Sequence, residues 1–90
     1  MSGTFSISHR PAIILFDSGA SHSFISSNFG AKVRLDYFHT KGSYMISTPS
    51  GKVASNQMVR TAPLKLGSKT IPTDLILLTL EGMDVILGME

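Results

Sequence analysis

Short apolar runs separated by turn-forming residues dominate this chain and predict β-strands. Residues 4–7 and 12–16 are rich in β-branched and aromatic side chains, and His-Arg-Pro separates the two runs. The run 12–16, "AIILF", is apolar throughout, so we expect its side chains to be buried. A further short apolar strand is expected at residues 85–87, near the end of the chain.

Two hairpins are expected in the second half of the chain. The stretch "SYMISTPSGKVASNQMV" looks like two extended arms around Pro49, Ser50 and Gly51, because proline presets its own φ and glycine tolerates a positive one. The stretches "APLKL" and "TIPTDLILLTL" form the arms of the second hairpin, which turns at residues 67–69.

One short helix is expected within "ASHSFISSNFGAKVRL". Ser21 or Ser23 can cap its start, the apolar residues of 24–29 share one broad face, and Gly30 can end it. Strands outnumber helices, so we predict an all-β fold, a small closed antiparallel β-barrel with one short helix. The apolar stretches 24–29 and 75–80 are expected to form its core.

The composition favours a single domain that associates with a partner. Ninety residues, 1–90, make one domain, and a domain of this size buries only about two-thirds of the surface that its unfolded chain exposes. Hydrophobic residues make up 42% of the chain and charged residues only 16%, which is consistent with a further surface hidden against a partner.

Several classes of ligand are disfavoured. The net charge of +2 comes from single Lys and Arg residues without a basic stripe, so no direct binding to nucleic acid is expected. Cysteine is absent, and His9, His22 and His39 have no carboxylate at ligand spacing, so neither a metal site nor a cofactor is expected. The most apolar window, Leu75–Leu80, is too short to span a bilayer, and no signal peptide precedes the domain. No membrane partner is expected, and a cytoplasmic location follows.

The stretch "IILFDSGASHS" places the carboxylate of Asp17 at the end of an apolar run. An Asp before Ser-Gly also suits an ordinary turn, because its side chain can bond the backbone two residues on. Three features favour a catalytic site: the apolar strand in front, the small residues Gly19 and Ala20, which leave room for a peptide backbone, and a second apolar strand ending in Gly88. That second strand can pack beneath the triplet.

Three motifs together resemble a known family. "ILFDSGASHSFIS", "ISTPSGKV" and "DVILGM" look like the retroviral-type (retropepsin-like) aspartic protease domain of gypsy-type LTR retrotransposons and their domesticated relatives. The resemblance covers residues 12–89, with the three motifs in the expected order. It implies a homodimeric endopeptidase that cleaves a polyprotein, with one Asp-Ser-Gly triplet from each subunit at a shared active site, and a location that includes a virus-like particle.

The resemblance also assigns residues. It implies that Asp17 is the catalytic carboxylate, that the Ser18 hydroxyl braces the two loops across the two-fold axis, and that the Gly19 carbonyl meets the substrate. The residues implied to contact substrate are Ala20, Ser21 and His22 in the cleft, Thr48, Pro49, Ser50 and Gly51 in a flap hairpin, and Ile86 at a side-chain pocket.

Peptide hydrolysis supplies a physical reason for a dimer. One group has to deprotonate water and another has to protonate the substrate, and two carboxylates that share one proton can do both. The triplet occurs once in the chain, so the second carboxylate has to come from a second copy. In the family, a helix and a final strand normally follow the last motif, and the 90 residues do not include them. We therefore expect a weak dimer that depends on the N-terminal strand and the triplet loops, or a monomer with little activity.

Three alternatives stay open. The domain can be a catalytically weak or inert module for dimerisation or peptide binding. His22 can activate Ser18, Ser21 or Ser23 as a nucleophile, although no acid in the sequence is placed to orient it. The segment "DSGASHS" can instead be an exposed recognition peptide that is read after phosphorylation.

Overall fold

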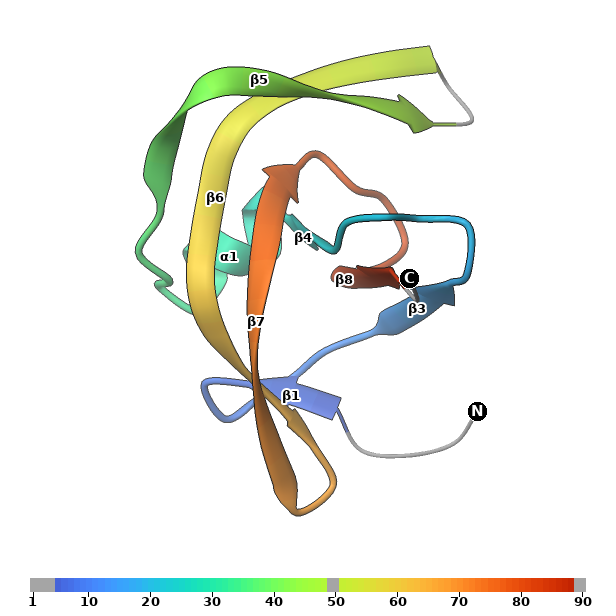
Figure 1. The fold of residues 1–90 in the computed structure, drawn as a ribbon. Helices are drawn as coiled ribbons and strands as arrows, with labels where there is room; N and C mark the ends of the chain where they lie inside the picture. The colour runs from blue at the N-terminus through green and yellow to red at the C-terminus, as the bar shows by residue number, and fades with distance from the viewer. Residues whose placement is uncertain (1–4, 49–50, 89–90) are drawn as a thin grey trace.

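The computed structural model describes residues 5–48 and 51–88 of the chain, and these form eight strands and one short helix (Figure 1). Thr4, expected in the first strand, and Pro49 and Ser50, expected in the flap, lie outside the described residues. The elements are β1 (Phe5–Ile7), β2 (Arg10–Pro11), β3 (Ile14–Asp17), β4 (Phe24–Ser26), α1 (Ser27–Lys32), β5 (Phe38–Thr48), β6 (Gly51–Leu66), β7 (Lys69–Leu78) and β8 (Val85–Gly88).

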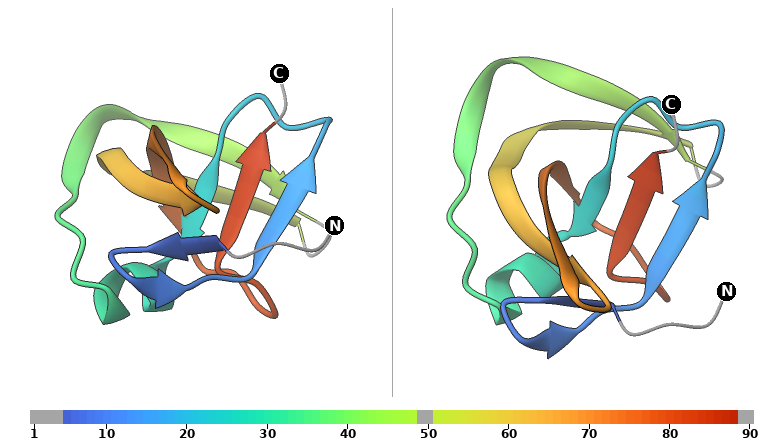
Figure 2. Two further views of the ribbon diagram at one scale, coloured as in Figure 1. Left: turned by 90° about the horizontal axis from the view of Figure 1, so that it is seen from below. Right: turned by 60° about the horizontal axis from the view of Figure 1, so that its bottom comes forward.

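The strands form one mixed sheet. Its order is β2-β1-β6-β7-β4-β8-β3, with β5 paired to β6 off this path. The expected all-β fold with one short helix is confirmed. The expected closed antiparallel barrel is wrong for two reasons. The pairs β3–β8 and β4–β7 are parallel, and the order of the described strands does not close into a ring. Pairing direction depends on how the connecting segments cross the molecule, which an apolar run does not encode. Figure 2 shows β3 and β8 side by side and pointing the same way.

Both expected hairpins are confirmed as pairs of antiparallel arms. In the β5–β6 hairpin, Thr48 lies opposite Gly51. In the β6–β7 hairpin, Leu66 lies opposite Lys69, and the turn between them contains Gly67 at φ 65°, a conformation that suits glycine. The β5–β6 hairpin arches over the loops that follow β3 and β7 (Figure 1).

The helix lies later in the sequence than predicted. Residues 24–26 form β4, which pairs with β7 in parallel and with β8 antiparallel, and all three of its residues are buried. The helix therefore begins at Ser27, and Ser26 caps it by accepting a hydrogen bond from the Phe29 amide at 3.4 Å. A short apolar run suits a buried strand as well as a helix, and the two neighbouring strands decide between them.

Gly30 lies inside the helix and is buried, so the expectation that it ends the helix is wrong. A Cβ at this position would lie 3.3 Å from Cδ2 of Leu77, so the absent side chain lets the helix approach β7 closely. The chain leaves the helix at Val33 and Arg34, and Arg34 adopts a φ of 57°.

The core lies on both sides of β4 and β7. One cluster surrounds Ile25 and Leu75, and a second contains Phe24, Ile76 and Leu78. Most apolar residues of the two expected core stretches are buried, whereas Thr79 is exposed and Leu80 is half-buried. No helix among the described residues is long and apolar enough to cross a membrane.

The strand β3 and Ile13, the residue just before it, are more exposed than expected. Ile13 is 63% and Leu15 is 46% exposed, so the prediction that residues 12–16 are buried throughout is wrong. This exposure arises because β3 is the last strand in the order of the sheet. One face of the strand is covered by the core and the other is not.

Candidate active site

A clamp at the start of β3 fixes its register against β8. The Asp84 carboxylate accepts a hydrogen bond from the Ile13 amide at 2.8 Å, and the Ile13 carbonyl accepts from the amides of Asp84 at 2.9 Å and Val85 at 3.1 Å. The two strands then run in parallel until Asp17 lies opposite Gly88. The clamp therefore determines where the strand delivers the Asp17 side chain.

The turn after β3 holds the Asp17 carboxylate. Its Oδ1 accepts a hydrogen bond from the Gly19 amide at 3.0 Å, and its backbone carbonyl accepts from the Ala20 amide at 3.2 Å. This is the side-chain turn that the sequence allows, and it orients a carboxylate that is exposed in the single chain.

Gly88 lies directly beneath the loop that follows the triplet, as the sequence predicts. A Cβ at this position would come within 2.6 Å of the carbonyl oxygens of Ala20 and His22, so no side chain fits there. The Gly88 amide also donates to the Ser23 hydroxyl at 3.1 Å. The end of β8 and this loop therefore support each other.

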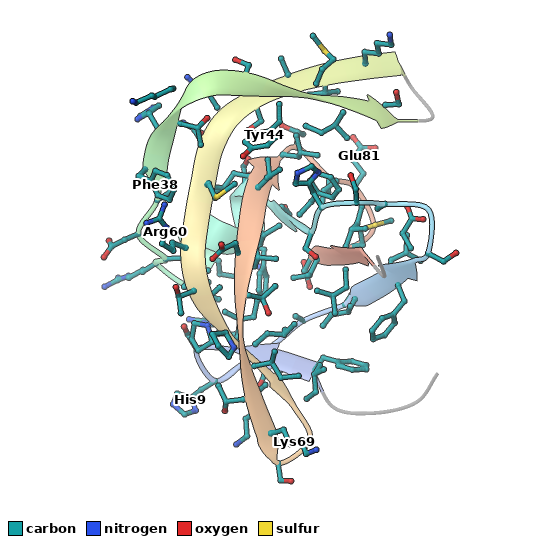
Figure 3. The ribbon with its side chains drawn as sticks, in the orientation of Figure 1. His9, Phe38, Tyr44, Arg60, Lys69 and Glu81 are labelled. Carbon is teal, nitrogen blue, oxygen red and sulfur yellow. The ribbon has the colours of Figure 1, made fainter. Side chains whose placement is uncertain are left out.

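The loop borders an open groove of about 990 Å³. It lies between the β5–β6 hairpin and the loops after β3 and β7, and Figure 3 shows Tyr44 and Glu81 in this region. The predicted site residues that line it are Asp17, Gly19, Ala20, Ser21, His22 and Ile86.

The remaining predicted site residues are not part of this lining. Ser18 and Gly51 are exposed outside it. The side chain of Thr48 and all of Pro49 and Ser50 lie outside the described part of the structure. The groove is therefore described without the tip of the hairpin.

His22 is oriented by two neighbours. The Ser21 hydroxyl lies 3.0 Å from His22 Nδ1, and the imidazole packs edge-on against the Tyr44 ring with 5.2 Å between ring centroids. Its contacts in the described structure thus include a serine but no carboxylate to orient the ring for catalysis. Within the same residues, no three His, Asp or Glu side chains come together as metal ligands.

Several groove residues were not identified from the sequence. Leu15, Met45 and Val53 come from strands, whereas Glu81 and Met83 come from the loop between β7 and β8. Met45 and Val53 flank the predicted hairpin tip, and this position is the one signal in the sequence that could have suggested these two residues. The others become neighbours only when the hairpin folds over the two loops.

The fold and the placement of the Asp-Ser-Gly triplet define a retropepsin-like domain. A family model described as retroviral aspartyl protease matches residues 1–90, and the chain belongs to this family. The crystal structure of the retroviral protease-like domain of Ddi1 from Leishmania major is similar in fold, with a TM-score of 0.69 and 18% identity over 96% of this chain and 69% of that chain. A comparison with curated protein sequences finds no match.

Proposed function

We propose that this domain is an aspartic endopeptidase in which the Asp17 carboxylates of two copies activate one water molecule. The observation that carries the proposal is the Asp17 side chain, which is held by the Gly19 amide at the edge of a groove of about 990 Å³. The family to which the chain belongs supports a protease.

The second copy is needed because each chain carries the triplet once. Asp17 is exposed in the single chain and Leu15, two residues earlier on β3, is 46% exposed, so this end of the strand is open to a partner. A two-fold axis beside the triplet brings two carboxylates together, and repulsion between like charges favours a single proton held between them.

The chemistry then follows from that shared proton. The ionised Asp17 takes a proton from water, whose oxygen attacks the peptide carbonyl, while the protonated Asp17 of the other copy donates its proton to the carbonyl oxygen. The resulting tetrahedral intermediate collapses as a proton passes to the leaving amine, and the carbon–nitrogen bond breaks. Ser18 would brace the two loops, and the Gly19 carbonyl would accept a hydrogen bond from the substrate backbone.

An extended peptide fits the groove as an added strand. The lining is largely apolar, with Leu15, Val53 and Ile86 among its side chains, so apolar residues would flank the cleaved bond. The β5–β6 hairpin would act as the flap that excludes water. We place the substrate in a polyprotein and the reaction in the cytoplasm.

The test compares Asp17→Asn with the wild type on an unstructured peptide library, with cleavage followed by mass spectrometry. Asp17→Asn should abolish cleavage without loss of the fold, because the carboxylate is exposed and the amide oxygen can still accept from Gly19. Asp36→Asn, which removes an exposed carboxylate outside the groove lining, is the matched control and should cleave normally. Cleavage by Asp17→Asn would exclude the mechanism.

Ser21→Ala separates the aspartic mechanism from the serine alternative that the Ser21–His22 contact permits. The proposed mechanism predicts that Ser21→Ala still cleaves. Sedimentation at several concentrations should show that activity follows the dimer. If the wild type binds peptides but does not cleave them as a dimer, the domain is a binding module instead.

A further inference from the structure

The lining of the groove contains acidic residues but no basic ones. The chain has eight Lys and Arg residues, and none of them lines the groove. The ionisable residues that do line it are Asp17, His22 and Glu81. With histidine neutral, the groove is therefore negative although the chain carries a net charge of +2.

The basic residues lie on other surfaces. Figure 3 shows Lys69 at the tip of the β6–β7 hairpin, at the far end of the molecule from Glu81. Arg60 lies over the Phe38 ring, with 4.8 Å from its guanidinium carbon to the ring centroid. Lys52 lies on β6 next to Val53, but it is not part of the groove lining.

Glu81 is held at the wall of the groove by its neighbours. Leu80 packs against the core cluster of Phe24, Ile76 and Leu78, and Gly82 turns the chain with a φ of 77°. Glu81 itself is exposed and lines the groove together with Thr79 and Met83. Its carboxylate is therefore available to a bound peptide.

We infer that Glu81 selects substrates that carry a Lys or Arg side chain close to the apolar residues at the cleaved bond. The inference rests on the proposed function, because it assigns a substrate class to the same groove. Apolar side chains of the peptide pack on residues such as Leu15 and Ile86, and the basic side chain pairs with the carboxylate of Glu81. Acidic peptides are disfavoured, because both Asp17 and Glu81 repel them.

The two-fold symmetry of the proposed dimer extends the preference for basic side chains to both sides of the cleaved bond. A second copy supplies a second Glu81 at the other end of the groove, so a basic residue on each side of the cleaved bond is favoured. An exposed ion pair of this kind changes affinity about fivefold, equivalent to about 1 kcal/mol. Two independent pairs would change it about 25-fold.

The experiment measures binding apart from cleavage. Labelled extended peptides with one central apolar pair, flanked on one or both sides by Lys, Gln or Glu, are titrated against the full chain carrying Asp17→Asn, with fluorescence anisotropy as the readout. Lys peptides should bind about fivefold more tightly than Gln peptides, and Glu peptides most weakly. The preference should shrink as salt is raised.

Adding Glu81→Gln should remove the preference for Lys, and Glu81→Lys should reverse it towards Glu. Asp36→Asn removes the same charge from an exposed position outside the groove lining and should leave the preference unchanged. Equal binding of Lys, Gln and Glu peptides, a preference that persists in Glu81→Gln, or no binding at all would overturn the inference.

Cleavage by the wild type is scored separately. Cleavage without any preference for basic peptides overturns the role of Glu81 and leaves the proposed protease intact. Selective binding of Lys peptides that depends on Glu81, without cleavage, supports the inference and contradicts the protease.

Discussion

Asp17 lies opposite Gly88 in the parallel pair β3–β8, so the residue that carries the carboxylate and the residue that supports its loop share one register position. The Gly88 position is also where the loop after the triplet approaches the sheet, because a Cβ there would lie only 2.6 Å from the carbonyl oxygens of Ala20 and His22. The site therefore depends on a side chain at one position and on the absence of one at the other.

Gly88→Ala should destabilise the domain by about 1–3 kcal/mol, because the added methyl group forces the loop away from β8. Gly42→Ala is the control, since a Cβ there meets nothing within 4 Å, and it should change the free energy of unfolding by less than about 0.5 kcal/mol. Denaturant unfolding measures both. Equal stabilities of the two variants would show that the loop is not packed as described.

Asp84→Ala should reduce both stability and cleavage, because it removes the acceptor for the Ile13 amide and frees the start of β3. The expected loss of stability is about 1 kcal/mol. Asp74→Ala is the matched control, since it removes a similar 2.8 Å bond to the Thr61 amide on β6.

The two variants should lose similar stability, but the rate of cleavage should fall further in Asp84→Ala. Hydrogen exchange at the Ile13 amide should accelerate in that variant alone. Equal rates of cleavage in the two variants would argue against a positioning role for Asp84.

Ile25→Ala should destabilise the domain by about 2–5 kcal/mol, because Ile25 is 0% exposed and its removal leaves a cavity in the larger core cluster. Ile13→Ala makes the same change at a side chain that is 63% exposed and should cost far less. Thermal unfolding compares the two. A large loss in Ile13→Ala would mean that β3 is covered on both faces in solution.

The proposed shared-proton mechanism predicts a bell-shaped dependence of the rate of cleavage on pH. In the proposed mechanism, a carboxylate pair that has taken up a second proton has no member left to accept a proton from water. At high pH the shared proton is lost and neither can donate one. Circular dichroism over the same range controls for unfolding, and a flat profile of the folded protein would contradict the shared-proton mechanism.

The local features of the site were predictable from the sequence because they depend on neighbouring residues. The Asp17 side chain bonds the Gly19 amide two residues on, as an Asp-Ser-Gly turn favours. Gly67 adopts the positive φ that its hairpin turn needs. The sequence also predicted that a second apolar strand ending in Gly88 could pack beneath the triplet, whereas the contacts that exclude a side chain at position 88 are seen only in the structure.

The errors arose where a segment has two good local conformations. Phe24 to Ser26 suit a helix or a strand, and their pairing with both β7 and β8 selects the strand. Ile13 and Leu15 belong to an apolar run that resembles a fully buried strand, yet β3 lies at the end of the sheet path with one face open. Neither outcome depends on the residues of the segment alone.

By itself, the sequence determined the strand that ends in Asp17, the small residues Gly19 and Ala20 that follow it and the two hairpins, because these depend on interactions within a few residues. Only the tertiary structure decided the parallel pairing of β3 with β8 and the composition of the groove, including Glu81. The physical reason is that burial and pairing are settled between segments distant in the chain, so the residues of any one segment do not specify its neighbours.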